Sequence, residues 1–211
     1  MTSSHAVLKL KSQADRRLRA GHLWIYSNEV DVQATPLKDF EPGQQVRVEN
    51  SAGKAMGLAY INPHSLICGR LFGRDIRYPL DKSLLVHRLN IALSLREAMT
   101  DKPYYRLVYG DSDFLPGLVV DRFADVVVVQ IATAGMEAVK QDIIDALVQV
   151  LKPDGILLKN DSRIRVSENL PEYVEVVYGQ VPERVAMEEN GVKFSVPVFS
   201  GQKTGWFYDH R

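Results

Sequence analysis

Hydrophobic and polar residues alternate in short runs over the first third of the chain. The runs occupy residues 6–10, 45–49, 55–61 and 66–72. Turn signals such as Glu41-Pro42-Gly43 and Asn62-Pro63-His64 separate them, and this pattern predicts a small β-barrel or sandwich. Residues 13–21 lie between the first two runs and suit one or two helical turns that end at Gly21.

The period changes to that of a helix after residue 80. Asp81 is suited to cap a helix that continues to Met99, because apolar residues recur near one face and Asp101-Lys102-Pro103 follows. Farther along, the β-branched run 126–133 predicts a strand buried on both faces. The spacing over Met136–Leu151 predicts an amphipathic helix. Further strands are expected at 106–109, 118–121, 156–159, 174–178, 185–189 and 192–198.

The composition is that of an ordinary soluble protein, with 45% hydrophobic and 25% charged residues in 211. No apolar run approaches the ~20 residues that cross a bilayer, and no signal sequence is evident, so we expect a cytoplasmic protein without membrane contact. Cys68 is the only cysteine and is expected to be a small buried residue; a catalytic nucleophile is the alternative. The five histidines lack ligand spacing, so no metal site is predicted.

The net charge is zero but uneven along the chain. Residues 1–77 hold 11 Lys and Arg against 7 Asp and Glu, a net charge of +4, and the remainder carries the opposite charge. Within the basic part, Arg16, Arg17 and Arg19 precede His22 and Trp24. Guanidinium groups pair with phosphate and aromatic rings stack on bases, so this cluster suits RNA; a solvated basic turn beside a buried Trp24 is the alternative.

Two loops and the last twelve residues also carry candidate chemistry. The loop 110–117 holds paired acids, but without the EF-hand spacing it favours a tight hairpin whose Asp side chains accept backbone N–H groups. The charges at 159–165 are expected to face solvent. The segment 200–211 joins glycines, Lys, Arg and aromatics as a binding site would, and stops there, which suggests the front part of a longer protein. No dinucleotide-type glycine fingerprint is present.

Four segments together resemble the bacterial S-adenosylmethionine-dependent methyltransferases that act on cytosine C5 of large-subunit (23S) ribosomal RNA. They are His22–Glu29, Gly110–Phe123, Asn160–Ser162 and Gly201–Arg211, in the family's order and spacing. Phe114 stands where the family often has Gly, and His210 where it often has Gln.

The resemblance implies an α+β protein of three parts. An N-terminal PUA-like pseudo-barrel that binds RNA would occupy 1–77. A linking helix and a central strand-strand-helix-strand-strand domain would occupy 78–190, and a truncated Rossmann-type catalytic domain would begin at 191. In the family the last domain holds the cofactor glycines and a cysteine whose thiolate attacks cytosine C6, after which C5 takes the methyl group.

The resemblance also implies the partners and the site residues. S-adenosylmethionine is the cofactor of the whole enzyme, ribosomal RNA is the partner, and a homodimer follows by analogy. No catalytic residue is expected within this chain, which we predict to be inactive alone. RNA contacts are expected from Arg16, Arg17, Arg19, His22, Trp24, Lys203 and Arg211. A wall of the cofactor or base pocket is expected from Gln202, Thr204, Gly205 and Asp209. The competing hypothesis is a free-standing, non-catalytic RNA-binding adapter.

Overall fold

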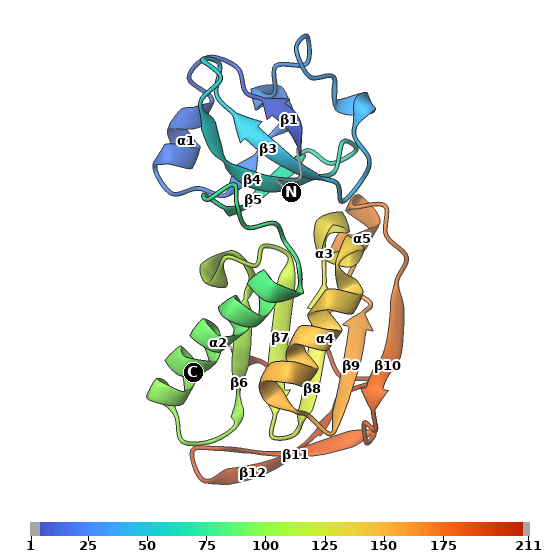
Figure 1. Cartoon of the computed structure of the whole chain (residues 1–211). Coiled ribbons are helices and arrows are strands. Elements are labelled where there is room, and N and C mark those ends of the chain that lie inside the picture. The colour runs from blue at the N-terminus through green and yellow to red at the C-terminus, as the bar shows by residue number, and fades with distance from the viewer. Residues whose placement is uncertain (1–4, 209–211) are drawn as a thin grey trace.

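The computed structural model describes residues 5–208, whose strands form two five-stranded sheets and one hairpin (Figure 1). The first sheet has the order β1-β3-β4-β5-β2, with β1 parallel to β3 and the other pairs antiparallel. Its strands are β1 (Ala6–Lys9), β2 (Trp24–Ile25), β3 (Gln45–Glu49), β4 (Ala55–Ile61) and β5 (Gly69–Gly73). Its short helical elements are α1 (Asp15–Arg19), η1 (Ser27–Glu29) and η2 (Leu37–Asp39).

The alternation of hydrophobic and polar residues in these strands reflects alternate burial of their side chains, since every second residue of β3 is buried. Leu8, Val46, Val48 and Leu71 share one core. The strand predicted over 66–72 begins only at Gly69, because residues 62–67 form a turn in which the backbone N–H of Ser65 donates to the carbonyl of Asn62. Leu66 is consequently exposed.

The segment between the sheets is held where it enters the linking helix. The side-chain amide of Gln45 donates to the carbonyl of Leu80 (2.8 Å) and accepts from its N–H (2.9 Å). Asp81 then caps α2 (Lys82–Met99), since its Oδ1 accepts from the N–H of Leu84 at 2.9 Å. The helix has the bounds that its sequence predicted.

The second sheet has the order β10-β9-β8-β7-β6, in which only β8 and β9 are parallel. Its strands are β6 (Tyr104–Tyr109), β7 (Leu118–Phe123), β8 (Val126–Ile131), β9 (Gly155–Asn160) and β10 (Tyr173–Gly179). Three strands, β6, β7 and β8, lie between α2 and the helical segment that leads to β9, one strand more than the resemblance implied. The turn η3 (Gly110–Asp113) joins β6 to β7, and α5 (Ile164–Ser167) follows β9.

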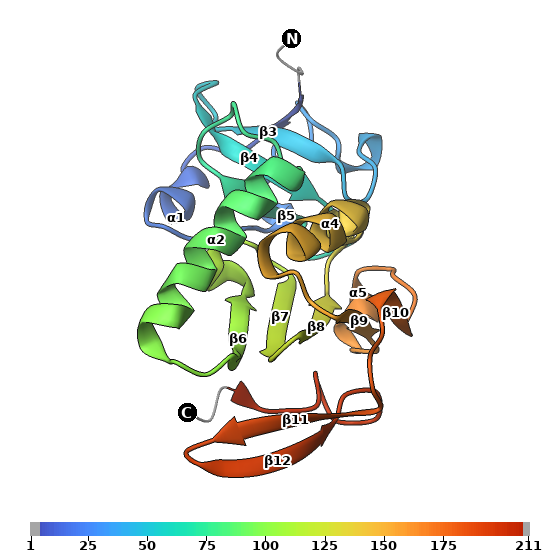
Figure 2. The ribbon, with the colours of Figure 1, turned by 60° about the horizontal axis from the view of Figure 1, so that its bottom comes forward.

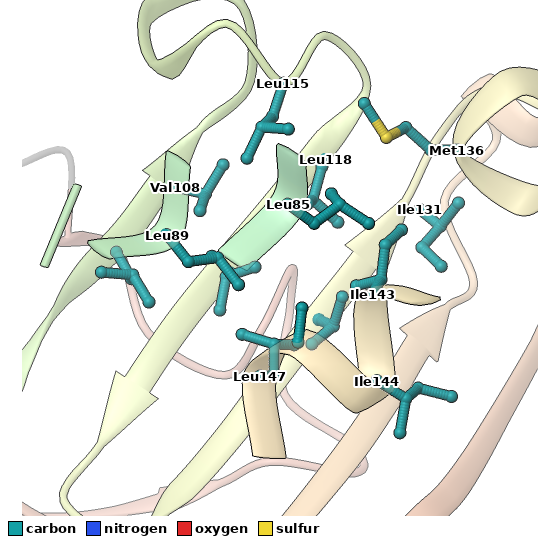
Figure 3. Packing of buried hydrophobic residues seen from close by; sticks show 14 of the residues in the cluster. Leu85, Leu89, Val108, Leu115, Leu118, Ile131, Met136, Ile143, Ile144 and Leu147 are labelled. Carbon is teal, nitrogen blue, oxygen red and sulfur yellow. The ribbon is translucent and has the colours of Figure 1, made fainter. Parts of the chain in front are cut away.

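Two helices, α2 and α4 (Lys140–Leu151), cover one face of this sheet (Figure 2). Leu85 and Leu89 of α2 and Ile143 and Leu147 of α4 pack into one cluster with the sheet (Figure 3). The strand β8 is buried on both faces as predicted. Val127 and Val129 join the helix-side core and Val128 joins the opposite one.

The single helix predicted over Met136–Leu151 is two helices. The first, α3 (Ala134–Ala138), ends at Val139, whose φ of −109° and ψ of 24° break the helix. A Cβ at Gly135 would lie 1.9 Å from the Tyr60 ring, so α3 is fitted against strand β4 of the first sheet. The break therefore lets α3 contact the first sheet while α4 lies along the second.

A hairpin covers the other face of the second sheet. Its strands are β11 (Arg184–Glu189) and β12 (Val192–Pro197), which pair along their full length. Met187 and Val196 pack with Val128 and Leu157 of the sheet. The division expected between 190 and 191 falls in the turn of this hairpin. The whole arrangement confirms the α+β class: a first sheet, a linking helix and a mixed second sheet.

Candidate functional site: a pocket where three motifs meet and a basic helix

A buried carboxylate joins the C-terminal segment to the second sheet. Asp121 of β7 is fully buried and accepts from Arg106 Nε (2.7 Å) and Nη2 (3.0 Å). Its Oδ2 also accepts from the hydroxyl of Thr204, which is itself fully buried. The bidentate pair and the third hydrogen bond satisfy a charge that would otherwise be costly to bury. Thr204 therefore anchors the C-terminal segment, and its place in the wall of a cofactor or base pocket stays a prediction.

A second anchor comes from Lys159, whose charge was expected to face solvent. Lys159 is buried, and its Nζ donates to Asp161 Oδ2 (2.6 Å) and to the carbonyl of Phe199 (2.9 Å). Arg165 is likewise fully buried and donates to the carbonyls of Ile131 and Pro171. The prediction of a solvated 159–165 was wrong for these two residues, because each also donates to a carbonyl distant in the sequence, Phe199 for Lys159 and Ile131 for Arg165.

These anchors leave an open pocket of about 430 Å³ between the motifs. Its lining consists of Arg106, Gln130, Asp161, Ser162, Gly201, Gln202 and Lys203. Gln202 and Lys203 are exposed, and Lys203 Nζ lies 4.5 Å from the centre of the Phe207 ring. The pocket thus combines two cations and one carboxylate with two amides and a hydroxyl, which suits the polar edge of a base.

The backbone of this segment needs its glycines. Gly205 has a φ of +107°, and a Cβ at Gly201 would lie 2.5 Å from the carbonyl of Pro197. Tyr208 closes the segment, since its hydroxyl donates to the carbonyl of Arg122 at 2.9 Å. Gly205 therefore shapes the turn. Asp209 and Arg211, expected in the pocket and at RNA, lie outside the described residues.

The basic cluster lies on and after α1. Arg16 is exposed, whereas Arg17 pairs with Glu29 (3.3 Å) and Arg19 with Asp15 (3.4 Å). Both carboxylates are largely buried, but the side chains of Arg17 and Arg19 are 41% and 62% exposed, so their guanidinium groups can also contact a phosphate. His22 follows on the surface. The α1 cluster therefore remains available to an anion.

Trp24 connects the first and second motifs. Its indole Nε1 donates to Asp111 Oδ2 at 3.1 Å, and the Arg70 guanidinium lies 5.5 Å from its ring centre. The side chain is 36% exposed, so it is neither core, as the alternative had it, nor a free stacking surface. The loop holding Asp111 is the tight turn predicted, with Asp113 Oδ2 accepting from the N–H of Tyr109 at 2.7 Å.

A buried polar network between the two sheets was not predicted. Glu168 lies 3.6 Å from Arg70, accepts from Asn62 Nδ2 at 2.8 Å and accepts from the N–H of Ala134 at 3.2 Å. The Tyr60 hydroxyl donates to the carbonyl of Pro116 at 2.6 Å, and its burial raises the pKa of the phenol. Sequence spacing holds no signal for these contacts, which join residues far apart in the chain.

Cys68 is fully buried, as expected for a small core residue. Burial raises the pKa of its thiol to about 12, so the nucleophilic thiolate is not formed near neutral pH. No helix in the described part is long and apolar enough to cross a membrane. Across residues 5–208 no group of three or more His, Cys, Asp or Glu side chains is arranged to hold a metal ion.

Comparisons with known proteins give a consistent result. Residues 8–74 match a family described as a PUA-like domain. The ribosomal RNA large subunit methyltransferase I of Aliivibrio fischeri (strain MJ11) is 35% identical over 201 residues, which are 93% of this chain and 50% of that protein. The protein of the same description from Vibrio vulnificus (strain CMCP6) is 33% identical over 211 residues. The chain spans about half the length of these relatives.

Solved structures show the same fold. A Streptococcus mutans protein assigned to the methyltransferases that depend on S-adenosylmethionine superposes with a TM-score of 0.79 at 22% identity. The match covers 98% of this chain and 52% of that one. At this identity the likeness supports the architecture alone.

Proposed function

We propose, on the premise that the chain is homologous to the N-terminal half of ribosomal RNA large subunit methyltransferase I proteins, that it binds ribosomal RNA and orients it for methyl transfer to cytosine C5. The observation that carries the proposal is the PUA-like unit at 8–74 with its arginine helix α1 on the surface. The same proposal assigns the chain to the cytosol, and a homodimer follows by analogy with the family.

Arg16, Arg17 and Arg19 would hold phosphates on the first sheet. At the far side of the second sheet, Gln202 and Lys203 would contact the RNA or the target base from their exposed positions beside Asp161. Thr204 and Gly205 act on this pocket indirectly, by fixing the backbone that carries Gln202 and Lys203. The residues thus divide into those that touch RNA and those that position them.

We expect the pocket beside Gln202 not to bind S-adenosylmethionine by itself. The pocket beside Gln202 is lined by polar and charged side chains and one glycine, without an apolar slot for an adenine ring. The chain also lacks the glycine-rich strand-to-helix turn that holds such cofactors. We therefore expect no methyl transfer and no cofactor binding by these 211 residues alone. Calorimetry showing micromolar affinity for S-adenosylmethionine would contradict this expectation.

The RNA-binding proposal is tested by gel-shift titration of a 23S ribosomal RNA fragment at several salt concentrations. Replacing Arg16, Arg17 and Arg19 with Ala should lower the slope of log affinity against log salt by about 2 to 3 units. A matched triple change at the exposed or half-exposed Lys140, Lys152 and Lys193 should have a much smaller effect. Equal losses from the two variants would place the RNA surface elsewhere, and no binding by the parent chain would refute the proposal.

A further inference from the structure

A groove of about 810 Å³ runs along the outer side of α2, separate from the pocket at Gln202. Leu84, Ile91 and Leu95 of α2 form one wall. The turn after η3 forms the other wall with Phe114, and Tyr78 lies where the linking segment enters α2. The residues that the proposed function assigns to RNA, on α1 and at Gln202 and Lys203, do not line this groove.

Two aromatic rings in the groove are exposed without structural need. Tyr78 is 55% exposed and Phe114 is 56% exposed. Phe114 also has a φ of +57°, a left-handed conformation that is costly for a bulky residue and natural for glycine. An exposed ring on a strained backbone gains nothing from packing. Such a ring is suited to stack on a flat ligand.

Two arginines and two aspartates line the groove, Arg77 and Arg88 with Asp81 and Asp113, so its positive charge is local to the two guanidinium groups beside the rings. Arg88 donates to the carbonyls of Phe72 and Phe114, and it forms no ion pair with a carboxylate in the described part of the chain. Burial lowers the pKa of its guanidinium only to about 10, so the charge remains at neutral pH. The carboxylate of Asp113 is already paired with Arg96 at 2.6 Å.

The second basic group at the groove is Arg77. Its guanidinium lies 5.4 Å from the centre of the Tyr78 ring and pairs with the exposed Asp75 at 2.6 Å. An exposed pair of this kind exchanges readily for a phosphate. Aromatic faces flanked by arginines favour an anionic chain with flat bases over an apolar peptide.

The groove continues the surface already assigned to RNA. Arg74 donates from its Nη2 to the carbonyl of Leu18 in α1 at 2.5 Å, which brings the linking segment against the basic helix. Trp24 contacts Asp111, one residue before Ser112 of the groove wall. Helices α1 and α2 lie on the same side of the molecule in both overall views (Figure 1, Figure 2).

We propose that the α2 groove binds unpaired nucleotides of the RNA held by α1, with bases stacked on Phe114 and Tyr78 and phosphates beside Arg77 and Arg88. This assignment rests on the proposed RNA-binding function and adds a site for single-stranded RNA to it. The basic helix then holds a structured region, and the groove takes the unpaired segment that leaves it.

The test uses the full 211-residue chain and two RNA probes with the same stem. One probe carries a loop with 2-aminopurine, whose fluorescence falls on stacking, and the other is fully paired. Phe114→Gly relieves the strained backbone, so the variant stays folded, and Tyr78→Ala changes an exposed ring. Each should weaken binding of the loop probe about 5- to 100-fold, the range of one base–aromatic stack, and leave the paired probe unchanged.

The controls distinguish a failure of the groove site from a failure of the proposed RNA-binding function. Tyr178→Ala removes a ring that is 40% exposed on β10 and should change neither probe. The triple arginine variant of α1 should weaken both probes. Wild-type affinity of Phe114→Gly and Tyr78→Ala for the loop probe overturns the groove site while leaving RNA binding by α1 intact. Failure of the parent chain to bind either probe overturns both. If Ile91→Glu converts a dimer into a monomer and leaves binding of the loop probe unchanged, the groove is assigned to self-association instead.

Discussion

Replacing Asp121 with Asn tests whether the buried carboxylate holds the C-terminal segment onto the sheet. Asp121 is fully buried and accepts two hydrogen bonds from Arg106 and one from Thr204. The amide keeps the shape but removes the negative charge that pairs with Arg106, whose side chain is only 10% exposed. Breaking a buried ion pair on one side costs about 3–5 kcal/mol, and we expect Asp121→Asn to lower the free energy of unfolding by about 3 kcal/mol.

Thr204→Val removes the hydroxyl that donates to Asp121, together with its longer contact to the carbonyl of Trp206 (3.4 Å), and keeps the side-chain volume. A hydrogen bond to a charged group contributes about 1.5–3 kcal/mol, so this variant should lose about 2 kcal/mol. The double variant should lose less than the sum of the two single variants, because both act on one network.

Urea unfolding followed by circular dichroism measures these changes, with an unchanged m-value as the sign that the native fold persists. Asp75→Asn is the matched control, because Asp75 also pairs with an arginine at 2.6 Å but on the surface. Its midpoint should stay close to that of the parent chain. An Asp121→Asn midpoint as close to the parent would refute the claim that this carboxylate anchors the segment.

Three further outcomes follow from the structure. Cys68 has its pKa raised from 9.0 to about 12, so its contribution to stability should be constant below about pH 9 and be lost as pH rises toward 12; Cys68→Ala should reduce the fall in urea midpoints over this range, and the phenols of Tyr60 and Tyr173, whose pKa values are also raised, account for the remainder. Gly135→Ala should lower the melting temperature despite better helix propensity, because its Cβ would overlap the Tyr60 ring; Gly73→Ala, with no atom nearer than 3.8 Å, should not. Glu168→Gln should speed amide hydrogen exchange in β4 and α3, and unchanged rates would show that this carboxylate does not hold the junction.

Local signals predicted the secondary structure well and long-range contacts poorly. The bounds of α2 follow from Asp81 and the apolar spacing behind it, which are all close in the sequence. The break at Val139 was missed because its cause, the Tyr60 ring beside Gly135, lies more than 70 residues away in the chain. A periodic pattern carries no information about such a partner.

The same division applies to the candidate site. The arginines of α1 and the exposed Gln202 and Lys203 are surface residues, as a binding role requires. Lys159 was misassigned because its acceptor Phe199 lies 40 positions farther along the chain. Charged residues are buried where the fold supplies an ion-pair or hydrogen-bond partner, and that partner is identified by the three-dimensional structure rather than by the local sequence.

Under the proposed RNA-binding function, the clamped segment between the sheets determines how an RNA gains from contacting both. Gln45 holds Leu80 by two hydrogen bonds, and Glu168 and Tyr60 join the sheets beside it. When a flexible tether joins two binding surfaces, the first contact raises the effective concentration of the second surface at the RNA. The freedom of the tether limits that increase. Here that freedom is already removed in the unbound protein, so no ordering of the tether opposes the second contact. The fixed spacing then selects RNA by shape, because a molecule whose two contact points are spaced differently engages only one.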